Sequence, residues 1–313
     1  MCIRYFTERK CYVFVALVLF LLVLAGCGGQ SATNTTASMN NGVQGIAATA
    51  TASSGEATAT ATLGHQPVGN VNLNWDPSDH MLTAQLTMMG LAPNSVHPVH
   101  INEGSCSSNS SASASDTGTP AVAKALYPLV NATADAHGVL NTTSKVSVPD
   151  GIPAKNWYLE VYNGPGLSTV AQATPIACGD IVNHDNSLRS AQSVQVPLAP
   201  PSGAGNQNAS GTAHLSLKGH TLTVQVTLNG LAPRSEHMAH IHSGTCAKQG
   251  SVVYPLTMLV ADGSGKAVSN TTIQNVITIP ASGWYVNIHD SNDLSTQTGF
   301  DPIACGDVTA SKS

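Results

Sequence analysis

The sequence predicts an all-β protein that contains two tandem antiparallel β-sandwiches of Greek-key type. Three observations predict this class: apolar and polar residues alternate over short segments, Gly and Pro separate these segments, and no stretch has sustained helical periodicity. Charged residues make up only 9% and aromatic residues 4% of the 313 residues, which is unlike a cytosolic helical enzyme or a coiled coil. The net charge of -5 argues against a nucleic-acid partner.

Period-two alternation predicts one hairpin in each half of the chain. The first joins residues 71–75 to 82–88, and the second spans 214–228 across the turn at Lys218, Gly219 and His220. In the second half, further short strands are expected at residues 239–242, 256–260, 267–273, 284–289 and 303–308. Seven or so short strands in about 100 residues are typical of a sandwich or flattened barrel.

The two halves are copies of each other. Residues 90–106 align without a gap on 230–246, and residues 175–180 align on 302–307. The change in offset indicates one insertion in the first copy, between Cys106 and Tyr127. We therefore predict two domains, at 65–190 and 211–313, with a Pro/Gly-rich linker at 191–210.

The N-terminus predicts export from the cytoplasm. Basic residues precede the apolar stretch 13–24, and Leu24-Ala25-Gly26-Cys27 resembles a bacterial lipobox. That resemblance implies a signal peptide at 1–26, a lipid on Cys27 that anchors the chain to the membrane, and a place in the cell envelope. An uncleaved membrane anchor is the alternative. The Ser/Thr/Ala-rich residues 27–64 are predicted to form a flexible tether.

Four cysteines remain after the signal peptide and the lipidated residue are set aside. They occupy matching places in the copies, so in an oxidising compartment we expect one disulfide within each copy, Cys106 with Cys178 and Cys246 with Cys305. A thiolate metal site is the alternative, but the cysteines lack the CxxC spacing of such sites.

Histidines in the second copy predict a metal site. His240 and His242 are two residues apart on a predicted strand and so face the same side, and His289 on a late strand is the candidate third ligand. Three imidazoles suit copper or zinc. A lone strand histidine is more often structural, but three in one short domain favour a metal.

The second copy resembles the copper/zinc superoxide dismutase superfamily and the slimmer CHRD (chordin-type) domains. The resemblance rests on residues 230–246, on the Val-Asn-Ile-His-Asp segment 286–290 and on the Ile-Ala-Cys-Gly-Asp segment 303–307; it covers residues 69–183 and 211–309. It implies that His240, His242 and His289 are copper ligands and that the cysteine pair is the family disulfide. His237, and His97 in the first copy, would be structural histidines that hydrogen-bond to the main chain.

The sequence also departs from the enzymes of that superfamily. Only seven residues separate Cys246 from Tyr254, where the enzymes carry a long loop with zinc ligands, so no zinc site is expected. Pro302, and Pro175 in the first copy, stand where the enzymes place an arginine that attracts superoxide. The ligand positions of the first copy read His100, Asn102 and Tyr162, so copper is expected in the second domain only.

Three functions remain open from the sequence. The first is an extracytoplasmic, lipid-anchored copper-binding protein with weak or no dismutase activity. The second is an active copper-only superoxide dismutase. The third is a CHRD-like structural or adhesive module in which the histidines are vestigial. The sequence does not identify a protein partner.

Overall fold

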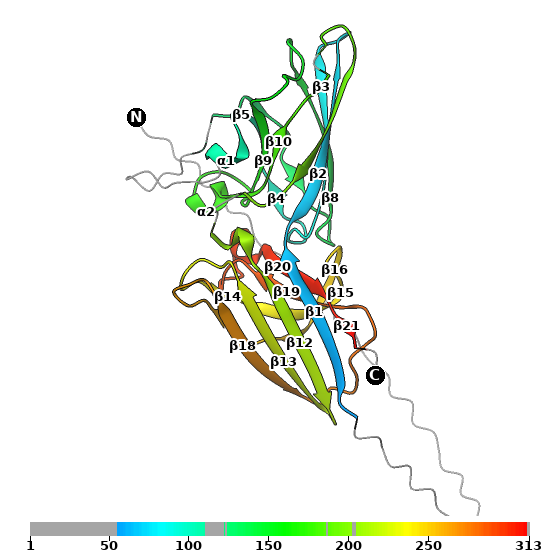
Figure 1. The fold of residues 1–313 in the computed structure, drawn as a ribbon, viewed down its shortest axis with the longest axis vertical. Coiled ribbons are helices and arrows are strands. Elements are labelled where there is room, and N and C mark those ends of the chain that lie inside the picture. Colours follow the sequence, from blue (N-terminus) through cyan, green and yellow to red (C-terminus); the bar gives the residue numbers. More distant parts are fainter. Residues whose placement is uncertain (1–54, 110–121, 123, 186, 202–204, 312–313) are drawn as a thin grey trace, which may run out of the picture. The chain divides into compact units, whose positions relative to one another are not determined.

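The computed structural model describes residues 55–109, 122, 124–185, 187–201 and 205–311. It confirms the all-β class: antiparallel strands dominate, and the helices are single turns (Figure 1). None of the helices in these ranges has the length and apolar character needed to span a membrane. The predicted signal peptide, Cys27 and most of the tether lie outside the described residues.

The first sandwich pairs two four-stranded sheets. One sheet has the order β11-β2-β3-β8 and the other the order β10-β9-β5-β6, with a small β4-β7 pair beside them. The strands of the first sheet are β2 (Val68–Asp76), β3 (Met81–Met89), β8 (Leu140–Ser147) and β11 (Gln192–Leu198). The others are β4 (Val96–His97), β5 (Val99–Glu103), β6 (Tyr127–Pro128), β7 (Ala132–Thr133), β9 (Trp157–Tyr162) and β10 (Pro175–Ile181), and the helical turns are α1 (Cys106–Asn109) and α2 (Val170–Ala173).

The second sandwich repeats this plan. Its strands run β16-β15-β19-β20-β1-β12-β13-β18, with β21 paired to β1 and a separate β14-β17 pair. Their bounds are β1 (Ala57–His65), β12 (Ser210–Lys218), β13 (Thr221–Asn229), β14 (Glu236–His237), β15 (Ala239–Thr245), β16 (Lys248–Pro255), β17 (Leu259–Val260), β18 (Ala267–Gln274), β19 (Trp284–His289), β20 (Pro302–Asp307) and β21 (Thr309–Ala310). The helical turns are η1 (Gly205–Asn208) and α3 (Gln297–Phe300).

Each sandwich has its own hydrophobic core. The inward residues of the paired sheets alternate with exposed polar ones, as in β13, where Leu222, Val224, Val226 and Leu228 are buried. One core contains buried side chains from residues 71–198, and the other contains residues 209–308 together with Ala59, Ala61 and Leu63 from β1. The second core therefore draws residues from both ends of the described chain.

Two of the predicted boundaries were wrong. Residues 57–64, assigned to the tether, lie in β1, a fully hydrogen-bonded strand of the second sandwich (Figure 1, blue between green β12 and red β20). Residues 192–198, assigned to the linker, lie in β11, which pairs with β2. Both segments alternate small or apolar residues with polar ones, so the period-two signal was present. The Ala and Thr residues of β1 resembled a tether, and the Pro- and Gly-rich run that begins at Pro197 made β11 resemble a linker.

Two other strand predictions need adjustment. The segment 256–260 is extended only over β17, and the preceding strand β16, which pairs with β15, was not predicted. The register of β15 with β16 shifts twice, near His242 and near Gly244, so β16 does not keep a regular alternation. That irregularity explains why a period-two search misses it.

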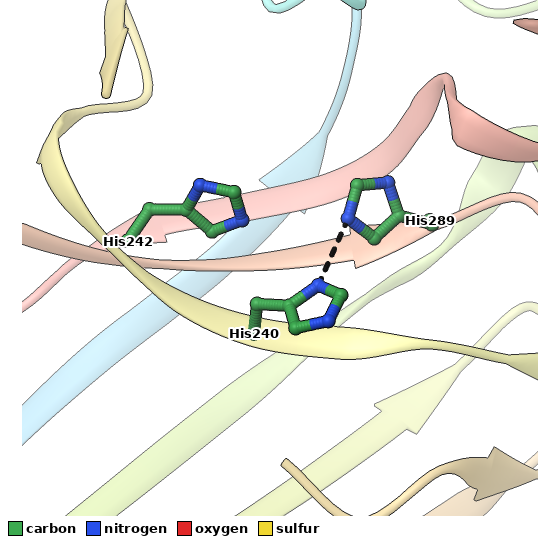
Figure 2. A group of neighbouring side chains, drawn as sticks. All are labelled: His240, His242 and His289. Carbon is green, nitrogen blue, oxygen red and sulfur yellow. Dashed lines mark hydrogen bonds between the residues drawn. The ribbon is translucent and has the colours of Figure 1, made fainter. Parts of the chain in front are cut away.

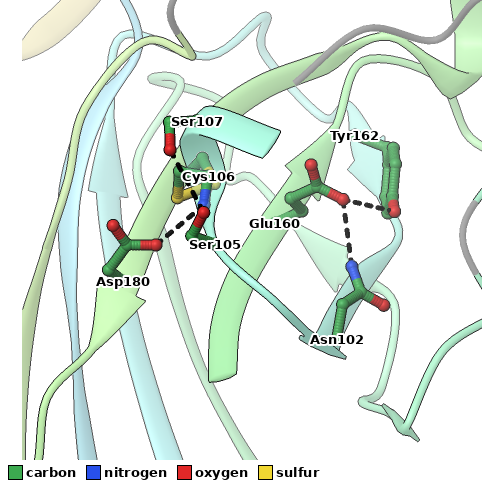
Figure 3. The surroundings of a disulfide bond; sticks show 8 residues. Asn102, Ser105, Cys106, Ser107, Glu160, Tyr162 and Asp180 are labelled. Atoms are coloured by element: carbon green, nitrogen blue, oxygen red, sulfur yellow. Dashed lines mark hydrogen bonds between the residues drawn. A yellow bond between two sulfur atoms is a disulfide. The ribbon is translucent and has the colours of Figure 1, made fainter. Parts of the chain in front are cut away.

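The predicted disulfides are both present, within copies and never between them. Cys106 pairs with Cys178 and Cys246 pairs with Cys305, at equal Cα separations of 5.9 Å. Each disulfide ties the segment after the histidine-bearing strand, β5 or β15, to β10 or β20 (Figure 3 shows the first). A carboxylate forms a hydrogen bond beside each disulfide. Asp180 accepts from the Cys106 amide at 2.7 Å, and Asp307 accepts from the Cys246 amide at 2.8 Å.

Candidate metal site

Two adjacent antiparallel strands position the three histidines. His240 and His242 project from β15 to the same side, and His289 ends the neighbouring strand β19. In the register of this pair His240 lies opposite Asn287 and His242 opposite Tyr285. The pairing of β19 with β20 shifts at His289, which re-aims its side chain toward the other two.

The structure brings these three histidines together. Each offers one ring nitrogen, and the three nitrogens lie within 4.8 Å of one another (Figure 2). The side chains are buried, with exposed fractions of 8% for His240, 6% for His242 and 1% for His289. Two nitrogens that each lie about 2 Å from one metal ion are at most about 4 Å apart, so the rings would move slightly closer together to hold an ion.

Main-chain carbonyls fix which nitrogen of two rings is free. Nδ1 of His242 lies 3.0 Å from the Gly250 carbonyl, and Nδ1 of His289 lies 2.6 Å from the Phe300 carbonyl. A carbonyl only accepts, so both Nδ1 atoms carry the proton and both Nε2 atoms present a lone pair. Nε2 of His242 has no hydrogen-bond partner among the described residues.

His240 completes the set with its other nitrogen. Its Nδ1 faces Nε2 of His289 at 3.2 Å (Figure 2). Because Nε2 of His289 is an acceptor, the neutral His240 ring donates its Nδ1 proton across this contact in the metal-free protein. Moving that proton to Nε2 frees the third lone pair. The available donor set is therefore Nδ1 of His240 and Nε2 of His242 and His289.

Burial keeps the rings neutral at physiological pH. Desolvation lowers the pKa of His289 to about 4, against the opposing effect of the Phe300 carbonyl and with smaller contributions from the charges of His240 and His242. Desolvation also lowers the pKa of His240 and of His242. Neutral imidazole is the form that binds metals, so the site is prepared for a cation without first losing protons to solvent.

Three side chains that the sequence did not single out border the histidines. The Tyr285 ring stacks on His242 with centroids 5.0 Å apart, and Phe300 packs against His289 at 4.9 Å. Nδ2 of Asn287 lies 3.5 Å from Nε2 of His289. Tyr285 and Asn287 lie on β19 with His289, whereas Phe300 ends α3, so the sequence pattern alone does not place the three around the site.

The two predicted structural histidines have equivalent surroundings. Nδ1 of His97 lies 2.9 Å from the Tyr162 carbonyl and that of His237 lies 2.9 Å from the His289 carbonyl. On the other side each Nε2 contacts a serine hydroxyl at 2.7 Å, Ser95 and Ser235 respectively. Each ring links its own strand, β4 or β14, to the main chain at the end of β9 or β19. Neither ring is one of the three clustered histidines.

The corresponding place in the first sandwich contains a different group. His100 and Asn102 on β5 match His240 and His242, Tyr162 on β9 matches His289, and Glu160 matches Asn287. Oε2 of Glu160 accepts from Asn102 Nδ2 at 3.0 Å and from the Tyr162 hydroxyl at 2.8 Å (Figure 3). Glu160 is only 2% exposed, and desolvation raises its pKa to about 7 although both hydrogen bonds oppose the shift.

Sequence analysis missed Glu160, although a signal was available. It is the single charged residue in the strand Trp157–Tyr162, and that strand is otherwise apolar or aromatic. A carboxylate between buried neighbours requires hydrogen-bond partners. The substituted ligand positions Asn102 and Tyr162 supply them.

Comparison with known proteins identifies part of the chain. Residues 186–293 match the family model of the CHRD domain. A search of curated proteins finds no match. The matched segment contains His240, His242 and His289, so the candidate metal site lies within the part of the chain that is similar to CHRD domains.

Proposed function

We propose that the second sandwich is a metal-binding CHRD domain that binds one copper ion through His240, His242 and His289. One observation carries the proposal: three buried imidazole nitrogens, two of them fixed as lone-pair donors by main-chain carbonyls, converge within 4.8 Å. Three imidazoles favour copper over the other divalent metals because Cu(II) forms the strongest complexes with nitrogen ligands.

This chain's residues hold and orient the ligands. Gly250 and Phe300 carbonyls fix the rings of His242 and His289, and this kind of support is typically worth 10- to 100-fold in metal affinity. Tyr285 and Phe300 shield one side of the rings from water. A bound copper ion would supply one-electron redox chemistry at this site.

The remaining features favour binding over fast dismutation. Pro302 and Pro175 occupy the positions where the resembling enzymes have an arginine, and the chain carries a net charge of -5. Attraction of an anion by a positive surface raises capture rates by about 10-fold or more, and no such surface is present at these positions. We therefore place copper binding first and expect any superoxide turnover to be slow and weakly dependent on salt.

Lipid anchoring at Cys27 is part of the proposal. The lipobox-like residues 24–27 support it, and two disulfides are typical of proteins outside the cytoplasm. Replacement of Cys27 by Ala should release the protein from the membrane fraction and abolish incorporation of a labelled fatty acid. Continued labelling of the variant would refute the anchor.

Copper titration of the purified metal-free protein tests the binding site. We expect one equivalent to bind, and we expect His242→Ala and His289→Ala to weaken binding by about 100-fold or more, because each removes a ligand. His100→Ala and Asn102→Ala, at the matching places of the first sandwich, are the controls and should leave the copper affinity and stoichiometry unchanged. Zinc competition should show copper preferred.

A superoxide assay on the same copper-loaded samples separates the alternatives. No stoichiometric copper in the unaltered protein, or equal binding by His289→Ala, would leave a CHRD module without a metal site. Turnover near the diffusional limit that falls steeply with salt would show an active dismutase.

A further inference from the structure

One strand occupies the same place in both sandwiches, beside the first strand of the long hairpin. In the first sandwich Gln192 of β11 lies opposite Trp75 of β2, and in the second Ala57 of β1 lies opposite Leu217 of β12. At its far end each strand also reaches the last strand of the other sheet, beside the disulfide: Ala199 bridges Cys178, and Gly64 pairs with Cys305. Strands β11 and β1 are therefore equivalent.

Their order along the chain is the opposite of their placement. Strand β1 comes directly before β2, the second strand of the first copy, but it pairs with β12 of the second. Strand β11 comes directly before β12 but pairs with β2 of the first copy. The CHRD match begins at residue 186, ahead of β11, so by sequence β11 is the opening strand of the second copy.

We propose that the two copies exchange their first strands, so that each sandwich is completed by the strand that opens the other copy. The chain then forms one interlocked unit, and the sandwich with the three histidines depends on residues that precede the whole first copy. This inference is independent of metal binding. The natural occupant of the β12 edge is the chain's own residues 57–65.

The exchanged strand is well integrated into its host. Ala59, Ala61 and Leu63 are 1–2% exposed and belong to the core of the second sandwich. Seven consecutive residue pairs join β1 to β12, and Ala59 and Thr60 also pair with β21. Strand β1 is thus paired on both edges and joins β20 on one side to β12 on the other.

Connection lengths give a physical reason for the exchange. Only Gln66 and Pro67 join β1 to β2. In an unexchanged copy Gly64 and His65 would pair with the last strand, and two residues would have to bring the chain back to Val68 on the other sheet. Short hinge connections favour strand exchange, because they leave the chain little room to leave one strand and return to the next in the same copy. Residues 199–209, between β11 and β12, impose no such limit.

Cysteine pairs in the full chain test the exchange, with Cys2, Cys11 and Cys27 replaced by serine. Thr60 lies opposite His214 across β1 and β12, and Gln195 lies opposite Asn72 across β11 and β2. Thr60→Cys with His214→Cys, and Gln195→Cys with Asn72→Cys, should each be joined within one molecule by a short bismaleimide. Thr60→Cys with Asn72→Cys is the matched pair for the unexchanged arrangement and should not be joined.

Peptide mapping by mass spectrometry and non-reducing electrophoresis distinguish the results. Intramolecular links in both exchanged pairs, with none in the matched pair, support the proposal. A link between positions 60 and 72 overturns it. A 60–214 link that yields covalent dimers also overturns it, because the strand then comes from a second molecule. Failure of both exchanged pairs, in protein whose native disulfides and circular dichroism are intact, overturns it as well.

Discussion

Equivalent strand pairs, β5–β9 in the first sandwich and β15–β19 in the second, hold different side chains at the site position. In the second, three imidazoles converge and two are locked by carbonyls, leaving lone pairs that face one another. In the first, Asn102 and the Tyr162 hydroxyl direct their hydrogens to one carboxylate oxygen of Glu160. The second site presents nitrogen lone pairs to a cation, whereas in the first site the hydrogen bonds from Asn102 and Tyr162 already occupy the carboxylate oxygen.

The difference shows what a metal site requires beyond the strands. Both places are buried, and both lie between the same two strands next to a disulfide. Converging lone pairs attract a cation, whereas side-chain donors around a buried carboxylate neutralise the need for one. Three or four side chains therefore separate a candidate metal site from a closed polar cluster.

Transfer of the site is expected to have the largest effect. Asn102→His and Tyr162→His with Glu160→Asn would give the first sandwich the side chains of the second, and copper titration should then show a second equivalent. Ala173 ends α2 as Phe300 ends α3, so the Ala173 carbonyl is the expected counterpart of the Phe300 carbonyl for position 162. Residue 123, which aligns with Gly250, lies outside the described residues.

The grafted site should bind about 10- to 100-fold more weakly than the native site when the ring at position 102 has no carbonyl partner like that of Gly250. The double variant without Glu160→Asn is the control, since the buried carboxylate would keep its hydrogen-bonding demands. Binding as tight as in the second sandwich would show that the ring at position 102 is supported as well as that of His242. No second equivalent would show that the backbones differ at the site.

Removal of the disulfides should affect both sandwiches alike. The bridges close loops with sequence separations of 72 and 59 residues. Loop entropy depends on the logarithm of loop length, so Cys106→Ser with Cys178→Ser and Cys246→Ser with Cys305→Ser should each cost about 4 kcal/mol or somewhat less. Chemical denaturation measures both, and a difference above about 1 kcal/mol would indicate that local packing dominates.

Buried ionisable groups should make the stability of both sandwiches depend on pH. Burial lowers the pKa of His97 and of His289 to about 4, so both sandwiches are expected to lose up to about 3 kcal/mol as the pH falls from 6.5 to 4, where unfolded histidine binds the proton more readily. Buried carboxyl groups oppose this trend, because burial raises the pKa of Glu160 in the first sandwich and of Asp290 and Asp301 in the second. The raised pKa of Glu160, about 7 against 4.5, removes stability from the first sandwich as the pH rises through that range.

In the first sandwich, the stability gained as the pH rises to 6.5 should therefore be offset by Glu160. Tryptophan fluorescence of metal-free protein separates the two sandwiches, because Trp75 and Trp157 lie in the first and Trp284 in the second. The Trp284→Phe variant reports the first sandwich, and the variant with Trp75→Phe and Trp157→Phe reports the second. Addition of Glu160→Gln should remove the offset from the first profile and leave the second profile unchanged, and an unchanged first profile would contradict the raised pKa of Glu160.

Replacement of Glu160 by Gln should have the smallest effect. Gln keeps an oxygen that accepts from Asn102 and Tyr162 and has no charge to desolvate, so the first sandwich should gain about 1–3 kcal/mol at pH 8 and nothing at pH 4. Asn287→Asp is the reciprocal variant and should destabilise the metal-free second sandwich. A loss of stability with Gln at pH 8 would mean that the ionised form is the favoured one.

The sequence by itself determined the fold class, the duplication, the disulfide partners and the three histidines that meet. These features depend on local alternation, on matched spacings and on side chains two residues apart, all of which a strand preserves. His240 and His242 are necessarily on one face, and Cys106 and Cys246 recur at the same distance from them. The assignment of His289, on β19, as a third ligand was supported by the family resemblance.

Only the tertiary structure decided which strand completes which sandwich, and which atoms face the site. Alternation in β1 and β11 indicates that each is a strand but not which edge it joins, because main-chain hydrogen bonds are the same at every edge. The tautomers of His242 and His289 depend on carbonyls of Gly250 and Phe300, contributed by a bulged strand and a single helical turn. Those contacts arise from chain closure, which no local pattern encodes.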